Sequence, residues 1–191
     1  MKVIAFNASA RKDGNTAVLI NQVFKELERE GIKTELIQLV GQKIQGCVGC
    51  GSCFKLKNNK CIITDDLINE YIAKIIQADG VIIGSPTYFA DCTAGCKALI
   101  ERAGMVNRAN SDLFKRKVGV AVVAVRRAGA IHAFDSINHF FTISQMIIVG
   151  SSYWNIGLGR QIGEAEKDEE GLSTMSTLGK NIAWLLKKIN G

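Results

Sequence analysis

The sequence contains one proline, two histidines and no long hydrophobic run. Its longest uninterrupted apolar stretch, residues 118–125, is far shorter than the ~20 residues that a helix needs to cross a bilayer, so we expect no membrane span. The apolar run at the N-terminus is too short for the core of a signal peptide, and no small-residue cleavage site follows it. We therefore expect a cytoplasmic protein.

Segments that separate domains are also missing. No internal repeat, no low-complexity stretch and no linker rich in proline, glycine or serine divides the 191 residues. A chain of this length buries roughly 70% of its unfolded surface, so a core forms without disulfide bonds. We expect one domain over residues 1–191, whose cysteines are free for other roles.

The charge is basic overall, with 24 Lys and Arg against 18 Asp and Glu, for a formal net charge of +6. Such a balance can favour nucleic acid or an anionic cofactor. The densest basic stretch has no nucleic-acid recognition motif. We interpret the overall basic charge as a solvated surface and expect no nucleic-acid partner. The residues of this basic stretch are Arg102, Arg108, Lys115, Arg116 and Lys117.

Apolar runs rich in Val, Ile and Ala alternate with stretches of helical spacing. The runs cover residues 2–7, 80–84, 117–125 and 146–150, and a weaker run covers 33–39. The stretches between and after them predict five helices. Strands that alternate with helices form a parallel sheet covered on both faces. The sequence therefore predicts a doubly wound α/β fold with five strands in the order 2-1-3-4-5, and an acidic surface loop at 164–170.

The binding site of such a fold lies where the winding of the sheet reverses. In the order 2-1-3-4-5 this point falls beyond the carboxyl ends of strands 1 and 3, in the loops after Asn7 and Gly84. A response regulator has the same strand order but needs an acidic pocket for magnesium at these strand ends. Because Asn7 and Ser85 stand there instead, we do not expect that signalling class.

The loop after strand 1 combines hydroxyl groups, a guanidinium and the start of a helix. Its polar residues are Ser9, Arg11, Asn15 and Thr16, and Gly14 permits a turn that other residues resist. Free N–H groups at a helix start attract phosphate. The segment matches neither GxxxxGK[ST] nor GxGxxG, so a monophosphate fits best. In the alternative interpretation, Asn15 or Thr16 caps the helix and Arg11 is a solvated charge.

The loop after strand 3 holds the only proline of the chain and an aromatic pair. Pro86 and Thr87 are followed by Tyr88 and Phe89. A flat heteroaromatic ring such as a flavin would give both aromatic side chains a surface to pack against, and the N–H groups of Thr87 and its neighbours could donate to its polar edge. The alternative is a rigid turn with Tyr88 and Phe89 packed in the core or in a dimer interface.

Four of the six cysteines lie in a C-x2-C-x2-C-x7-C arrangement within a cysteine-rich loop at about residues 45–63. They are Cys47, Cys50, Cys53 and Cys61. Three thiolates at three-residue intervals can bind three irons of a cubane, and the fourth comes from a longer excursion. Zinc more often has two separated C-x2-C pairs or a histidine, and no histidine is nearby. The spacing leaves a [4Fe–4S] cluster, free thiols, zinc and a disulfide open, whereas we interpret Cys92 and Cys96 as small helix residues.

Three segments together resemble a known family. They are Ser9-x-Arg11-x-x-Gly14-Asn15-Thr16, Ser85-Pro86-Thr87-Tyr88 followed by Lys97-Ala98-Leu99-Ile100-Glu101-Arg102, and the cysteine segment. Over almost its whole length the sequence is similar to the flavodoxin-like NAD(P)H-dependent FMN reductases, and within them most closely to the iron-sulfur flavoproteins of anaerobes. The resemblance implies a flavodoxin-like fold with FMN as cofactor.

The resemblance also implies a set of cofactor-binding residues. In the family, the first loop holds the FMN phosphate, the second lies along the isoalloxazine ring, and a loop after strand 4 closes over that ring. The corresponding positions here are Ser9, Arg11, Asn15 and Thr16; Pro86, Thr87, Tyr88 and Phe89; and Arg126, Arg127 and Gly129. For the cysteine segment, the resemblance favours a [4Fe–4S] cluster on the four thiolates.

The implied activity is electron transfer from NAD(P)H or a reduced carrier to a quinone, a free flavin or a one-electron partner, with the [4Fe–4S] cluster as an intermediate carrier where it is present. Because the flavin carries the chemistry, we expect no catalytic side chain. The alternative is a non-catalytic FMN electron carrier without a cluster. The resemblance, with Tyr153 and Trp154 after strand 5, further implies a homodimer or homotetramer.

Overall fold

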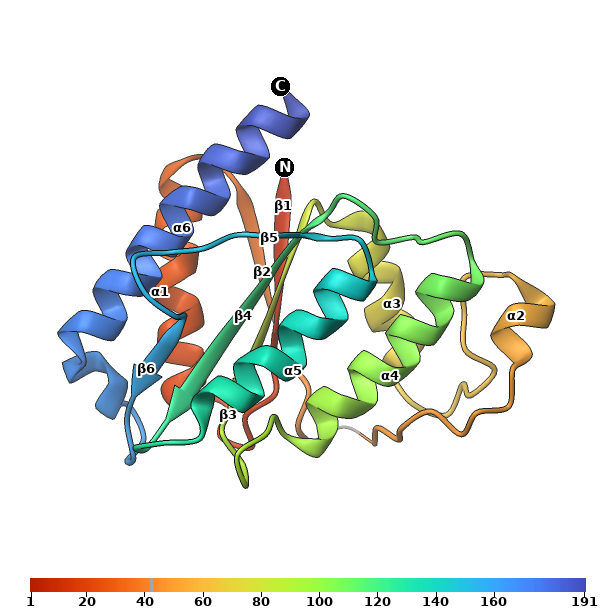
Figure 1. Ribbon diagram of the computed structural model, residues 1–191, viewed down its shortest axis with the longest axis horizontal. Helices are drawn as coiled ribbons and strands as arrows, with labels where there is room; N and C mark the ends of the chain where they lie inside the picture. Colours follow the sequence, from red (N-terminus) through yellow and green to blue (C-terminus); the bar gives the residue numbers. More distant parts are fainter. Residues whose placement is uncertain (42) are drawn as a thin grey trace.

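The computed structural model describes residues 1–41 and 43–191. Its strands form one parallel sheet in the order β2-β1-β3-β4-β5, with a further strand, β6, paired to β4 (Figure 1). The strands are β1 (Lys2–Asn7), β2 (Lys33–Gln38), β3 (Gly80–Pro86), β4 (Val118–Val125), β5 (Ile147–Ile148) and β6 (Ile156–Leu158). The predicted doubly wound fold and its strand order are confirmed.

The helices connect these strands and return the chain to the same end of the sheet. They are α1 (Asn15–Arg29), α2 (Ser52–Leu56), α3 (Ile68–Gln77), α4 (Ala94–Ala109), α5 (Ala130–Ile143), the short 3-10 helix η1 (Glu164–Lys167) and α6 (Glu169–Asn190). Within the described residues, no helix is both long enough and apolar enough to cross a bilayer.

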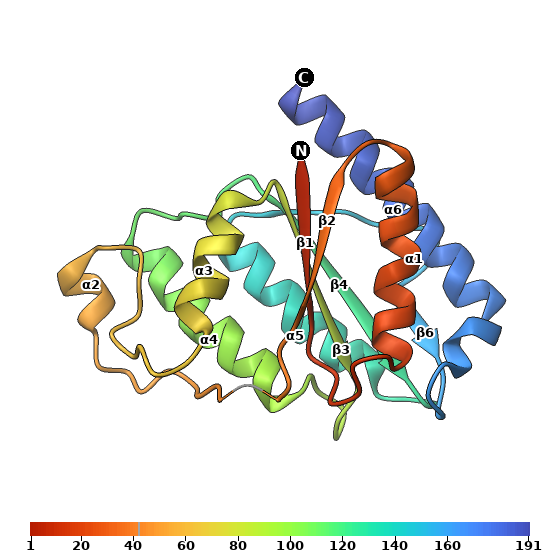
Figure 2. The same ribbon diagram turned by 180° about the vertical axis from the view of Figure 1, so that it is seen from behind.

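Both faces of the sheet are buried, as an all-parallel sheet requires. Helices α1 and α6 cover one face and α3, α4 and α5 cover the other, as Figures 1 and 2 show from opposite sides. Along β4, Val120 and Val122 pack in the layer with α1 and α6, whereas Ala121 and Val123 pack in the other layer. Because successive side chains point to opposite faces, a strand buried on both sides must be apolar throughout.

The edge of the sheet beside β4 differs from the prediction. The expected strand at 146–150 shrinks to β5, which pairs with the start of β4, and β6 pairs with Val123–Val125 at the other end. The sequence analysis missed β6 because three residues are too few to show a period. The expected acidic loop at 164–170 is also wrong, since these residues form η1 and the first turn of α6, where Asp168 accepts a hydrogen bond from the N–H of Gly171 at 3.0 Å.

The cysteine segment leaves the sheet after β2 and returns at α3. It carries α2, which was not predicted and which packs on α4 at the far end of the molecule from α6 (Figure 1). This five-residue helix lies between two residues in the left-handed region, Gly51 at φ 68° and Lys57 at φ 47°. Five residues are too few to show helical periodicity in the sequence.

We expect Gly119→Ala to destabilise the fold by about 1–3 kcal/mol, the usual cost of overpacking a core. A Cβ atom at Gly119 would lie 2.6 Å from Cγ of Phe141, whose ring is fully buried. The matched control is Gly104→Ala in α4, whose Cβ would meet only the Phe140 ring at 3.7 Å, an ordinary contact. That control should stabilise the protein by about 0.5–1 kcal/mol in urea unfolding because alanine favours the helix. Equal midpoints for the two variants would contradict this account of the sheet packing.

Candidate functional site

The loops after β1 and β3 meet at the carboxyl end of the sheet and form a cleft of ≈ 210 Å³, which we term the switch-point cleft. Eight of the eleven predicted cofactor-binding residues line it: Ser9, Arg11, Asn15, Thr16, Pro86, Thr87, Tyr88 and Arg126. The other lining residues are Ala124, Gly159 and Arg160. The structure thus brings together most of a set that the sequence spreads over three separate loops.

The first loop is shaped by Asn7, whose side chain is fully buried. Its amide nitrogen donates to the carbonyl of Lys12 at 3.1 Å and to Oε1 of Gln38 at 2.8 Å, and its Oδ1 accepts from the N–H of Ser9 at 3.1 Å. Oγ of Ser9 then accepts from the N–H of Arg11 at 3.1 Å. Asn7 therefore positions the backbone of the first loop. From the sequence, Asn7 served only as an argument against a response regulator.

Helix α1 points its N-terminus into the switch-point cleft without a side-chain cap. Its first return bond runs from the N–H of Val18 to the carbonyl of Gly14, so the amides of Asn15, Thr16 and Ala17 precede the hydrogen-bonded part of the helix. Oγ1 of Thr16 is buried and has no hydrogen-bond partner in the described part of the chain. The alternative in which Asn15 or Thr16 caps the helix is therefore wrong.

The side chain of Asn15 binds the segment after β6, so neither of its polar atoms is left unpaired in the cleft. Its Nδ2 donates to the carbonyl of Gln161 at 2.9 Å, and its Oδ1 accepts from the N–H of Ala165 at 3.1 Å. Nη1 of Arg11 likewise donates to the carbonyl of Arg160 at 3.3 Å. The segment after β6 is thereby fixed against the first loop and forms a wall of the cleft.

This wall, formed by Gly159 and Arg160, was not predicted from the sequence. Gly159 is essential to it, because a Cβ atom there would lie 2.5 Å from Nδ2 of Asn15. The clustered glycines at 157, 159 and 163 are a signal of close backbone approach. That signal does not reveal which segment is approached, since Asn15 lies far away along the chain.

The second loop forms a tight two-residue turn. The N–H of Tyr88 and the carbonyl of Asp91 are hydrogen-bonded at 2.8 Å, and Phe89 and Ala90 between them have φ of 49° and 63°. The N–H of Thr87 donates to the carbonyl of Ala124 at 2.9 Å. The prediction that the Thr87 amide is free for a ring is therefore wrong, whereas Oγ1 of Thr87 is buried without a partner among the described residues.

The aromatic pair of this turn is exposed. Tyr88 is 49% exposed and lines the cleft, and Phe89 is fully exposed at the tip of the turn. The alternative in which both side chains pack in the core of the chain is therefore wrong.

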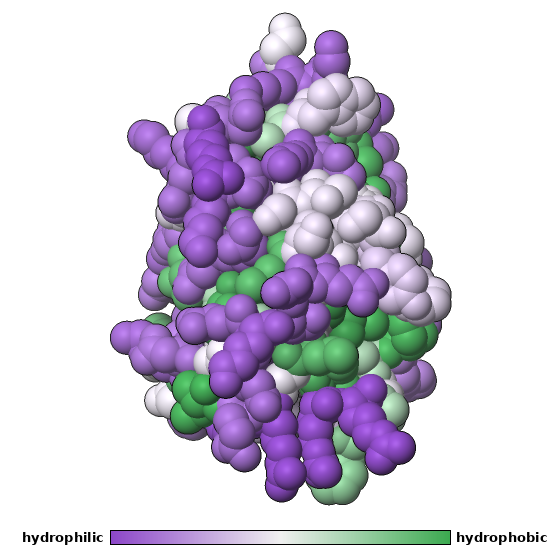
Figure 3. Space-filling view, turned by 90° about the vertical axis from the view of Figure 1, so that its left-hand side faces the viewer, coloured by the Kyte–Doolittle hydropathy of each residue, from purple (hydrophilic) through white to green (hydrophobic). Residues whose placement is uncertain are grey.

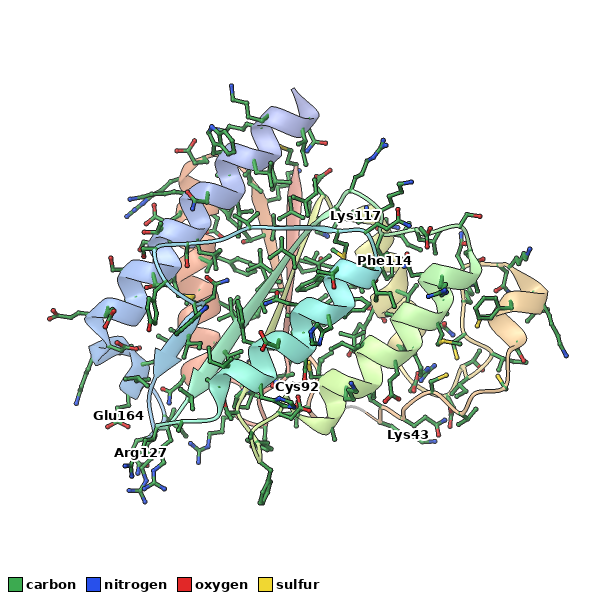
Figure 4. The ribbon with its side chains drawn as sticks, in the orientation of Figure 1. Lys43, Cys92, Phe114, Lys117, Arg127 and Glu164 are labelled. Atoms are coloured by element: carbon green, nitrogen blue, oxygen red, sulfur yellow. The ribbon has the colours of Figure 1, made fainter. Side chains whose placement is uncertain are left out.

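The third loop approaches the second through Gly129. This residue has φ of 84°, and a Cβ atom on it would lie 3.3 Å from Cα of Ala90. Arg126 lines the cleft, whereas Arg127 is exposed and lies at the same edge of the molecule as Glu164 (Figure 4). Hydrogen bonds from the backbone N–H groups of Gln161 and Arg160 hold the pKa of Glu164 below its ordinary value.

The cysteine segment forms a second concave site. All four predicted cysteines line one small cavity of ≈ 20 Å³ between α2 and α4, which we term the cysteine cavity. Cys47 and Cys50 are exposed, Cys61 is half-buried and Cys53 is buried. Among the described residues the cysteines are all free thiols, and no group of three His, Cys, Asp or Glu side chains surrounds a position for a single metal ion. Cys92 lies away from this cavity, below α5 (Figure 4).

Two side chains that the sequence analysis did not single out hold the backbone of this segment. The N–H of Cys61 donates to Oδ1 of Asn69 at 2.7 Å, and Nδ2 of Asn69 donates back to the carbonyl of Cys61 at 2.9 Å. The N–H of Cys47 donates to a carboxylate oxygen of Glu101 at 3.2 Å. Hydrogen bonds from Ser52 lower the pKa of the Cys50 thiol, and burial raises that of Cys53.

Residues 1–161 match the family described as NADPH-dependent FMN reductase. The chain belongs to this family. An iron-sulfur flavoprotein of Methanocaldococcus jannaschii is 38% identical over 196 residues, covering 99% of each chain. Another iron-sulfur flavoprotein, from Methanosarcina thermophila, is 30% identical and covers 99% of this chain and 97% of its own. The family predicted from the sequence motifs is confirmed.

Solved structures agree on the fold of this family member. An NAD(P)H:quinone oxidoreductase from Methanothermobacter marburgensis superposes with a TM-score of 0.69 at 14% identity, covering 95% of this chain and 96% of its own. At such low identity the likeness concerns the flavodoxin-like fold alone. Family membership, by contrast, supports an FMN-dependent oxidoreductase.

Proposed function

We propose that this protein binds FMN in the switch-point cleft and uses it to move electrons from NAD(P)H to an acceptor. The observation that carries the proposal is a pair of buried hydroxyl groups, on Thr16 and Thr87, that have no partner among the described residues and line one cleft. Burying a hydroxyl without a hydrogen bond costs free energy, so such groups indicate a missing partner. A ligand with polar groups at two separate positions supplies it.

The phosphate end of FMN belongs at the first loop. The amides at the start of α1, Oγ1 of Thr16 and the guanidinium of Arg11 converge there. Because Oγ of Ser9 already accepts from the N–H of Arg11, its own hydrogen is free to donate to the phosphate. We assign Asn15 a positioning role, since both polar atoms of its side chain hold the segment after β6.

The ring end belongs between the second and third loops. Thr87 offers its unpartnered hydroxyl, Tyr88 offers a half-exposed aromatic surface, and Arg126 adds a positive charge at the rim. Pro86 and Gly129 shape the backbone around this part of the cleft, while the exposed Phe89 and Arg127 stand where a second molecule can reach them. Bound FMN would accept a hydride from a nicotinamide and release electrons singly.

We further propose that Cys47, Cys50, Cys53 and Cys61 hold a [4Fe–4S] cluster. In a cubane each thiolate binds a different iron, so four cysteines that line one volume without surrounding a single point fit a cluster better than one zinc ion. The present cavity has room for about one water molecule, so the segment must open on its exposed side, at Cys47 and Cys50. The glycines beside these cysteines, at φ of 67° and 68°, permit that backbone freedom.

Anaerobic purification followed by a steady-state assay tests the proposed function. We expect one FMN per chain and catalytic oxidation of NADH or NADPH with a quinone, free flavin or one-electron protein as acceptor. A pure electron carrier would hold FMN but would not turn over a nicotinamide. Protein that binds no FMN would contradict the assignment of the cleft, whatever its activity.

We expect a homodimer or homotetramer in solution. The rings of Tyr153 and Trp154 are tilted against each other with centroids 4.7 Å apart and are 59% and 51% exposed, and Trp184 on α6 is exposed as well. Figure 3 views the molecule from the left-hand side of Figure 1, the side of α6, and shows pale and green surface beside strongly hydrophilic surface. Light scattering at micromolar concentration should give at least twice the chain mass of 20.8 kDa, and Trp154→Ser should shift the equilibrium toward a single chain. A wild-type particle with the mass of one chain would contradict this prediction.

A further inference from the structure

The side chain of Arg102 lies inside the protein, and the residue lines the cysteine cavity. Its side chain is fully buried on α4, so Arg102 is not part of the solvated surface expected of the basic residues as a whole. Arginine is always charged in proteins, and a buried cation requires compensating groups. The contacts of Arg102 therefore show which groups compensate its buried charge.

Three acceptors tie Arg102 to the two ends of the cysteine segment. Its Nη1 donates to the carboxylate of Asp66 and to the carbonyl of Gln45 at 3.4 Å, and its Nη2 donates to the carbonyl of Ile63 at 2.9 Å. The side chain of Asp66 is fully buried as well. These bonds fasten residues 45 and 63–66 to α4, so Arg102 closes the loop that carries the cysteines.

One donor of Arg102 remains without a partner. Its Nε is buried and has no hydrogen-bond acceptor within the described part of the chain. Arg102 lines the same small cavity as all four cysteines of the segment. An unpaired buried N–H is costly, and sulfur atoms are the chemical groups gathered on the other walls of this cavity.

We propose that Arg102 is a positioning residue for the group held by the four cysteines: its Nε–H donates to a sulfur atom of that group, and its charge stabilises the group's reduced form. This inference rests on the proposed cluster. One electron delivered by reduced flavin makes the cluster one unit more negative and breaks no bond. A nearby cation with a hydrogen bond to sulfur favours that state, because hydrogen bonds to sulfur and local charge set the potential of such clusters.

The test is a redox titration of the reconstituted protein, followed by the absorption and EPR signals of the cluster. Arg102→Gln should lower the ratio of reduced to oxidised cluster about tenfold at a fixed potential, a shift of about 59 mV to more negative values for a one-electron couple. Asp66→Asn removes the buried anion beside Arg102 and should shift the potential in the opposite direction. Arg102→Lys keeps the charge without the Nε–H and should fall between wild type and Arg102→Gln.

The matched control is Arg108→Gln, which removes one positive charge from the exposed surface of the same helix and should change that ratio less than threefold. A merely structural role for Arg102 predicts that all variants at positions 66 and 102 lose iron together while the remaining cluster keeps the wild-type potential. That result would overturn the inference about Arg102 but not the proposed cluster. Shifts of the reduction potential in the same direction for Arg102→Gln and Asp66→Asn would do the same. Wild-type protein that holds less than one iron per chain after reconstitution overturns both the inference and the proposed cluster.

Discussion

Replacing Cys53 by serine should remove most of the bound iron and leave FMN in place. Cys53 is the buried member of the cysteine set, and the N–H of Lys57 donates to its carbonyl at 3.0 Å, so its position on α2 is fixed. Serine offers a far weaker ligand for iron than a thiolate. We expect about four irons and four sulfides per chain in anaerobically reconstituted wild type and less than one iron in the variant.

Retention of FMN follows from the separation of the two sites. The cysteine cavity and the switch-point cleft share no lining residue among those that the structure describes. Oxidation of the nicotinamide should therefore continue in Cys53→Ser, while transfer to a one-electron acceptor is lost. The loss of hydride oxidation together with the iron would show that the two sites are not independent.

The control for this experiment is Cys92→Ser, which removes a thiol outside the cysteine cavity. Its iron content should equal that of wild type. Iron and sulfide are measured chemically under strict exclusion of oxygen, because air degrades exposed clusters and leaves thiols or disulfides. Full iron content in Cys53→Ser would refute the assignment of Cys53 as a ligand.

Replacing Thr16 by valine should weaken FMN binding and at the same time leave the FMN-free protein as stable as wild type, or more so. Valine keeps the shape of threonine and removes only the hydroxyl, which is buried and unpartnered in the described structure. Without FMN this removal relieves a desolvation cost of about 1–3 kcal/mol. With FMN it removes a hydrogen bond to a charged phosphate, worth about 1.5–3 kcal/mol or roughly 10- to 150-fold in Kd.

The opposite signs separate a ligand-binding role from a structural one. FMN affinity is measured by fluorescence quenching, and stability by urea unfolding of protein stripped of flavin. Thr142→Val is the matched control, because Thr142 is exposed near the end of α5 and donates only to the carbonyl of His139. It should leave the FMN affinity unchanged. A Thr16→Val protein that is destabilised without FMN and binds FMN normally would refute the phosphate assignment.

Most of the sheet could be predicted from the sequence because its signals are local. A strand buried on both faces is mostly apolar, and β1, β3 and β4 show this as nearly continuous apolar runs in which Asn7 and Ser85 stand only at the carboxyl ends. The alternation of such runs with helical spacing then leaves a parallel, doubly wound sheet as the simplest arrangement. Strands as short as β5 and β6 carry no period, and their places depend on pairing with opposite ends of β4.

The two candidate sites also have features that could be predicted from the sequence and features that could not. The loops that meet at the switch point and the four cysteines could be found from the chain alone, because residues that bind one group gather at strand ends or at short intervals. The contacts of Asn15 with residues 161 and 165, and the burial of Arg102 against Asp66, became visible only in the folded molecule. Each of these contacts joins segments far apart in the chain, where periodicity and spacing carry no information. Whether a polar side chain is solvated, structural or free for a ligand is set by those distant partners.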